Sequence, residues 1–147
     1  MDLSELYTEL IAEYSQSKIY RNTLPPPAIK KRGVNPSCGD DITLYLDIRD
    51  DIIQKAVYSG SGCAISQASA AMMLELLEGK SVTEARELVE IFLGMIQKSV
   101  TEENQLNRLE QALVFQNISN MPARVKCAVL CWHTLYDALK KESDCGK

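Results

Sequence analysis

The sequence contains no block of lysine and arginine and no apolar run long enough to cross a bilayer. Its formal net charge is −4, which argues against a nucleic acid as the main partner. Its longest apolar run, residues 127–132, is far shorter than the roughly 20 residues of a membrane-spanning helix. The N-terminal segment is acidic where a secretory signal needs a basic start and a solid apolar stretch. We therefore expect a cytoplasmic protein that binds neither nucleic acid nor membrane.

The sequence also lacks a CxxC pair, and His133 is its single histidine. These absences argue against a zinc-ribbon knuckle and exclude a histidine-rich metal site. A thiol redox pair made of Cys127 and Cys131 is disfavoured, because their CxxxC spacing lacks the CxxC arrangement that suits disulfide exchange. The cysteines number five, and an odd number without a secretion signal argues against a disulfide framework. They are packing residues, metal ligands or reactive groups.

The chain of 147 residues, 46% hydrophobic and 24% charged, has the size and composition of one globular domain. It is long enough to bury a core without help from metal or disulfides. It shows no internal repeat and no low-complexity tract. We expect a single domain over residues 1–147.

The order of the periodic patterns predicts strands early and helices late. Helical spacing predicts a helix over 3–16, and the proline-rich stretch that follows is expected to be loop with a short edge strand near 28–31. Alternation predicts a hairpin of strands 42–48 and 52–60. Four later helices are expected. The first covers about 64–78, with Gly79 as its C′ residue, and the second runs from the capping box 81–84 to about 98. The third covers 101–118, and the fourth covers 121–142, with Pro122 in its first turn and a frayed tail at 143–147 after it. The fold class is α+β, a small antiparallel three-stranded sheet packed against four to five helices.

Cys38 stands in the segment NPSCGD, residues 35–40, which has no apolar run. Gly39 permits a tight turn, so the side chains of Cys38 and Asp40 can point at one centre. The alternative is an exposed loop thiol beside a capping aspartate.

Cys63 follows a glycine-rich corner at the point where a helix is predicted to begin. Amide groups at a helix N-terminus favour the thiolate, which is the form that binds metal and attacks sulfur. Cys127 lies near Arg124 and Lys126, whose charges also favour a thiolate. The alternatives are a small packing residue at position 63 and a core residue at position 127.

Three other candidates are weaker. Cys131 shares a helix face with Cys127 and is either an extra ligand or, as its neighbours Leu130 and Trp132 favour, a core residue. His133 is expected on the exposed helix surface, and Cys145 is expected to be an incidental thiol in the tail.

A site built from Cys38, Cys63 and Cys127 would have to be assembled by the fold, because the three lie far apart in the sequence. With Asp40 they would form a Cys₃Asp tetrahedron, a donor set that suits zinc. A purely structural zinc site usually takes four cysteines, or three cysteines and a histidine. The aspartate therefore favours a site that exchanges ligands or performs chemistry.

Three segments together resemble one protein family. They are residues 35–40 (NPSCGD), residues 60–73 (GSGCAISQASAAMM) followed by EGK at 78–80, and residues 123–135 (ARVKCAVLCWHTL). In this order they resemble the SufU, IscU and NifU N-terminal family of iron–sulfur cluster assembly proteins, over nearly the whole chain. The resemblance is closer to the zinc-binding SufU branch, because the stretch from Gly79 to Cys127 is longer than in IscU-type scaffolds. Lys126 also replaces the histidine that precedes their third cysteine.

The resemblance implies a single IscU/SufU-like domain of SufE/NifU-like fold, with Cys38, Asp40, Cys63 and Cys127 as zinc ligands. Cys38 would accept sulfur from a SufS-type cysteine desulfurase and pass it to downstream iron–sulfur assembly proteins, with Arg124 as a supporting residue. The chain would then be a zinc-dependent sulfurtransferase that acts with the desulfurase rather than as a stand-alone enzyme. It would meet pyridoxal phosphate only through that partner.

Two other functions stay open at this point. One is a scaffold on which a transient [2Fe–2S] cluster is assembled and transferred, with the same four residues as ligands. The other is a structural zinc domain that acts only as a binding module.

Overall fold

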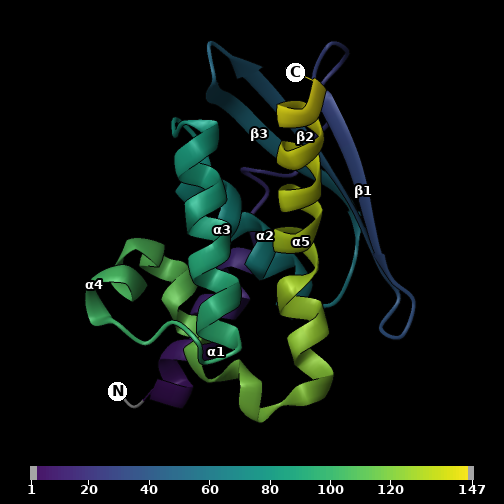
Figure 1. Cartoon of the computed structure of the whole chain (residues 1–147). Helices are drawn as coiled ribbons and strands as arrows, with labels where there is room; N and C mark the ends of the chain where they lie inside the picture. Colours follow the sequence, from purple (N-terminus) through teal and green to yellow (C-terminus); the bar gives the residue numbers. More distant parts are fainter. Residues whose placement is uncertain (1–2, 146–147) are drawn as a thin grey trace.

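Three antiparallel strands form one sheet, and the helices lie on one of its faces (Figure 1). The computed structural model describes residues 3–145. Its elements, in chain order, are α1 (Leu3–Gln16), β1 (Ile29–Asn35), β2 (Asp40–Arg49), β3 (Ile52–Ser61), α2 (Ala64–Leu77), α3 (Val82–Ile96), α4 (Glu103–Leu106), the 3₁₀ helix η1 (Asn107–Asn120) and α5 (Pro122–Cys145). The strand order is β1-β2-β3. The predicted α+β class and three-stranded sheet are confirmed.

Two tight connections hold the sheet in register. Asp50 and Asp51 join β2 to β3 with φ angles of 53° and 66°. Two left-handed residues in succession form a type I′ turn, whose twist matches that of an antiparallel hairpin. β1 is longer than the predicted edge strand, because it continues to Asn35, which pairs with Asp40 at the start of β2. The loop between β1 and β2 is therefore only residues 36–39, and the sheet holds both of its ends.

Helix α5 lies across β1 and packs closely on it at Gly33. A Cβ atom at Gly33 would collide with Oγ1 of Thr134 on α5. Only glycine permits this approach, which brings the helix onto the sheet. The contact fixes the position of α5 relative to the hairpin of β1 and β2.

The helix boundaries with local capping signals follow the prediction. Gly79, with a φ of 88°, comes directly after the C-cap of α2. Ser81 caps α3 by accepting the N–H of Glu84 on its hydroxyl at 3.1 Å. Pro122 is the first residue of α5. In the core, the ring of Trp132 stacks on the ring of Phe92, with the two ring centroids 4.0 Å apart.

The prediction of one continuous helix over 101–118 is wrong. The segment forms the short α4 and then η1, which is interrupted at Glu110 with φ 52° and ψ −122°. Its buried side chains recur at every third position: Leu106, Leu109, Ala112, Phe115 and Ile118. After the interruption at Glu110, the three residues per turn of a 3₁₀ helix place Ala112, Phe115 and Ile118 on one face, whereas the 3.6-residue turn of an α-helix would rotate them away. Packing of this face against the neighbouring helices α3 and α5 favours the tighter winding.

The C-terminal helix continues further than predicted. α5 runs to Cys145 rather than to about residue 142. Residues 146–147 of the predicted frayed tail, and the side chain of Cys145, lie outside the described residues. Within residues 3–145, no helix has the length and apolar character that crossing a membrane requires.

Candidate metal centre

The loop between β1 and β2 places Cys38 and Asp40 at one end of the sheet. The N–H of Cys38 donates to the carbonyl of Asn35 at 3.2 Å and closes a turn. Gly39 follows with a φ of 72°, a backbone conformation that other residues rarely adopt. The chain therefore turns back sharply. Cys38 is exposed, and Asp40 enters β2 with its side chain fully buried.

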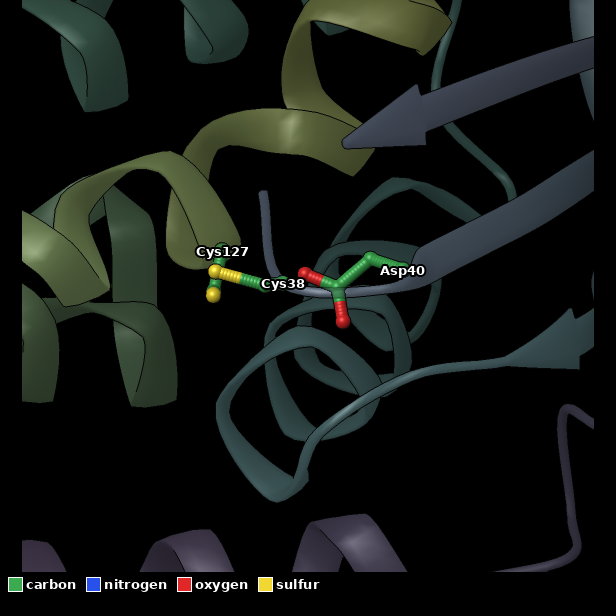
Figure 2. A group of neighbouring side chains, drawn as sticks. All are labelled: Cys38, Asp40 and Cys127. Atoms are coloured by element: carbon green, nitrogen blue, oxygen red, sulfur yellow. The ribbon is translucent and has the colours of Figure 1, made fainter. Parts of the chain in front are cut away.

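Three predicted site residues meet at this end of the sheet. One sulfur or oxygen atom from each of Cys38, Asp40 and Cys127 lies within 4.8 Å of the other two. Figure 2 shows the sulfur atoms of Cys38 and Cys127 together, with the carboxylate of Asp40 beside Cys38. Cys127 comes from the first turns of α5 and is only 4% exposed. The fold thus joins residues that are far apart in the sequence.

Cys63, the remaining predicted site residue, borders this group. Its sulfur is not one of the three donor atoms that lie within 4.8 Å of one another, but Cys63 is near enough to raise the pKa of the Cys127 thiol. It is the N-cap of α2, as the prediction of a helix start at this cysteine requires, and its sulfur accepts the N–H of Ser66 at 3.4 Å. The backbone N–H of Cys63 donates to Oδ1 of Asp40 at 3.0 Å. The four candidate residues therefore form one connected group.

The Cys127 thiol keeps its proton in the metal-free group. Burial raises the pKa of the Cys127 thiol, and the neighbouring side chains of Cys38, Cys63 and Asp40 raise that pKa further. The proton therefore stays on Cys127 unless a positive charge takes its place. Metal binding replaces the protons of such thiols, which is why a site of this kind binds metal with release of protons.

Asp40 carries a second sign of a metal site. Its Oδ2 atom is buried and has no hydrogen-bond partner among the described residues. A buried carboxylate oxygen without a partner is unfavourable, so a cation at this position would account for it. Thiol sulfurs from three cysteines together with one carboxylate oxygen form a donor set that suits zinc. The residues present fit a zinc ion.

The other predicted candidates lie away from this group. Cys131 is 1% exposed, with its sulfur 3.5 Å from Oγ of Ser69, and burial raises its pKa to about 12. The structure therefore favours the packing interpretation for Cys131. His133 is exposed on α5, as expected. Arg124 and Lys126 are also exposed, and within residues 3–145 neither side chain is hydrogen-bonded to the candidate ligands.

Sequence reasoning missed two residues behind the Cys63 loop, Arg21 and Gln67. Arg21 donates to Oε1 of Gln67 at 2.7 Å, and Nε2 of Gln67 donates to the carbonyl of Gly62 at 2.7 Å. Neither residue has a local signal, because one is a single arginine in a loop and the other a polar residue in the first turn of a helix. Only the tertiary structure brings them to the site.

Sequence comparison places the chain in a known family. The family model of the NifU-like N-terminal domain matches residues 22–128. The chain belongs to the NifU-like N-terminal domain family. This NifU-like chain is 42% identical over 138 residues to the iron–sulfur cluster assembly scaffold protein IscU of Thermotoga maritima, covering 94% of this chain and 95% of that one. It is 34% identical over 142 residues to the zinc-dependent sulfurtransferase SufU of Bacillus subtilis, covering 96% and 94%.

The fold agrees with this assignment. The NifU-like chain matches the crystal structure of a Fervidobacterium islandicum protein described as an iron–sulfur cluster assembly scaffold protein for the SUF system. The TM-score is 0.85 at 37% identity, and the match covers 92% of this chain and 97% of that one. The family resemblance seen in the three sequence segments is confirmed. The names of the relatives cover both scaffolds and a sulfurtransferase.

Proposed function

We propose that this protein works in iron–sulfur cluster assembly as a zinc-bound acceptor of persulfide sulfur from a SufS-type cysteine desulfurase. The observation that carries the proposal is the convergence of an exposed thiol, Cys38, with the buried side chains of Asp40 and Cys127 within 4.8 Å. The similarity to a SufU that is named a zinc-dependent sulfurtransferase supports it. The exposed thiol is within reach of a partner, and the buried donors are suited to hold a metal.

Each of the four residues has a role in this proposal. Cys38, Asp40, Cys63 and Cys127 hold the zinc, which when bound keeps its cysteines as thiolates and has no redox chemistry of its own. The N–H of Cys63 binds one oxygen of the Asp40 carboxylate and leaves the other, buried oxygen available to the metal. Cys127 lies in α5 and Cys63 caps α2, whereas Cys38 lies on the short exposed loop. Cys38 is therefore the ligand that can move to meet a partner.

The sulfur step exchanges one S–S bond for another. The Cys38 thiolate attacks the outer sulfur of the persulfide on the desulfurase cysteine, and a new S–S bond forms at Cys38. The S–S bond on the desulfurase breaks, its electron pair leaves with the desulfurase cysteine as a thiolate, and the proton stays on the transferred sulfur. The step involves no net oxidation or reduction. A second exchange of the same kind passes the sulfur to a downstream assembly protein.

A second candidate function is a scaffold for a [2Fe–2S] cluster, because the Thermotoga maritima relative is named a scaffold protein. The same four residues would be its ligands. The two functions differ in what the protein carries and in what it does to the desulfurase.

Metal analysis of the protein as isolated, followed by desulfurase turnover with and without it, tests the proposal. The acceptor function predicts one zinc per chain and a large rise in turnover. Iron with acid-labile sulfide and unchanged turnover would instead support the scaffold.

A further inference from the structure

We propose that Arg21 and Gln67 are positioning residues for the metal centre. Their side chains form a relay of hydrogen bonds that holds the loop over residues 60–63 in the shape that presents Cys63 to the other ligands. The inference rests on the proposed function only in that Cys63 belongs to the metal site.

Arg21 is itself fixed by the edge of the sheet. The N–H of Tyr58 donates to the carbonyl of Tyr20 at 2.8 Å, and the N–H of Asn22 donates to the carbonyl of Tyr58 at 2.9 Å. Arg21 and Tyr58 are therefore paired by a parallel bridge beside β3. The guanidinium group also lies 5.2 Å from the centre of the Tyr58 ring and donates to its hydroxyl at 3.4 Å. These contacts with β3 therefore hold both the backbone and the guanidinium group of Arg21 in place.

From this fixed position the relay holds two carbonyl groups of the loop. Arg21 donates to the carbonyl of Gly60 at 2.8 Å and to Oε1 of Gln67 at 2.7 Å. Gln67 in turn donates from Nε2 to the carbonyl of Gly62 at 2.7 Å. The carbonyls on both sides of Ser61 are thus bound by side chains. The residue after Gly62 is Cys63, whose N–H donates to Asp40 and whose sulfur caps α2.

The relay restrains the loop through hydrogen bonds. Within residues 3–145, Arg21 forms no ion pair, and its hydrogen bonds go to neutral oxygens. A guanidinium group presents several donors in a rigid fork, so it can bind Gly60 and Gln67 together. The loop contains two glycines, whose backbone freedom is large unless something restrains it. Groups that orient metal ligands in this way typically change metal affinity by about 10–100-fold.

Two variants break different links of the relay. Arg21→Lys keeps the positive charge but replaces the fork with a single ammonium group, which cannot hold Gly60 and Gln67 in the same geometry. Gln67→Glu keeps an acceptor for Arg21 but loses the donor to Gly62. Arg49→Ala is the matched control, because Arg49 is an exposed arginine at the far end of β2 that is paired with Asp47 at 3.0 Å. It should behave as the unaltered protein does.

The first measurement is the alkylation rate of each cysteine in the metal-free protein, resolved by peptide mass mapping. Both relay variants should alkylate Cys63 severalfold faster, while the rate at exposed Cys38 stays unchanged. The second measurement is cobalt(II) titration, which reports affinity and, through the thiolate-to-cobalt absorption band, the number of bound thiolates. The variants should bind cobalt about 10–100-fold more weakly and show a weaker band at saturation.

Loss of stability alone would overturn the inference. If both variants unfold more readily but keep the Cys63 alkylation rate, the cobalt affinity and the band intensity of Arg49→Ala, the relay only supports the fold. The alkylation assay uses metal-free protein and no desulfurase. If the unaltered protein binds metal but accepts no sulfur, the proposed function fails, and the cobalt affinity and the rate at Cys63 still decide on the relay.

Discussion

Oδ1 of Asp40 accepts the backbone N–H of Cys63 at 3.0 Å, while Oδ2 of the same carboxylate is buried without a partner among the described residues. This hydrogen bond joins the start of β2 to the start of α2 and sets the direction of the free oxygen. In the metal-free protein the free oxygen is destabilising, because a buried polar atom has lost water and gained nothing. A cation at this position would remove the penalty and stabilise the fold by its binding free energy.

Asp40→Asn separates these two effects. The amide keeps an oxygen to accept the N–H of Cys63 and removes the carboxylate charge. We expect the metal-free variant to be more stable than the unaltered protein, because a buried charge without a counter-charge is removed. Zinc should no longer raise its Tm. Urea unfolding of the metal-free protein and thermal melts with zinc measure both quantities.

Asp40→Ala is the matched comparison, because it leaves the N–H of Cys63 without an acceptor. Its free energy of unfolding should be lower than that of Asp40→Asn. An Asp40→Asn variant that keeps the full zinc-dependent rise in Tm would show that Asp40 is not a ligand.

Gly33→Ala should lower both the stability and the metal affinity. The added Cβ collides with Oγ1 of Thr134 and pushes α5, with Cys127, away from the hairpin that carries Cys38. Overpacking of this kind typically costs about 1–3 kcal/mol. Thr134→Ala removes the colliding hydroxyl, so the double variant should regain part of the loss in a double-mutant cycle. Additive losses in unfolding free energy and zinc affinity would contradict this account.

Cys131→Ala should change the alkaline stability and leave the zinc content unchanged. Burial raises the pKa of Cys131 from 9.0 to about 12 in the folded protein, so only the unfolded chain ionises this thiol between those values. The stability is therefore fully present below the lower value and falls as the pH rises toward the upper one, by up to about 1.4 kcal/mol per pH unit. Urea unfolding at pH values on both sides of 9.0 should show a steeper loss in the unaltered protein than in the variant. Equal slopes, or a loss of bound zinc, would contradict the packing role.

Alkylation of single cysteines should report metal removal directly. In the metal-free protein, exposed Cys38 should react fastest, and buried Cys127 and Cys131 slowest. Zinc should protect Cys38, because its sulfur would then be a ligand, and should leave the slow rate of Cys131 unchanged. Peptide mass mapping after a short pulse of iodoacetamide measures these rates. A Cys38 that reacts equally fast with and without zinc would not be a ligand.

Local chemistry explains which parts of the fold could be predicted. Asp50, Gly79 and Ser81 mark turns and caps whose sequence preferences are strong, and the elements that they bound were predicted closely. The prediction for residues 101–118 failed because the side chains that become buried there follow a period of three. Leu113 and Val114 interrupt this period in the sequence, so only the burial seen in the structure separates the 3₁₀ series from an amphipathic α-helix.

The candidate site also contains residues that local sequence signals indicate and residues that only tertiary contacts bring together. Cys38, Asp40 and Cys63 have local signals, namely a glycine turn and a helix start. At Cys127 the nearby charges of Arg124 and Lys126 suggested a thiolate, and that expectation is wrong, because the residue is buried and burial raises the pKa of its thiol. Its place in the site depends on the contact between Gly33 and Thr134, which joins two distant segments. Such contacts, like those of the Arg21 relay, need the three-dimensional structure.

The most direct test of the central claim is peptide mass mapping of the protein after turnover with a SufS-type desulfurase and cysteine, with free thiols and persulfides trapped by alkylation. The account predicts one added sulfur atom, on Cys38, and predicts that Cys38→Ala carries none and fails to raise desulfurase turnover. Added sulfur on Cys131 or Cys145 instead, or a Cys38→Ala variant that raises turnover as the unaltered protein does, would contradict it.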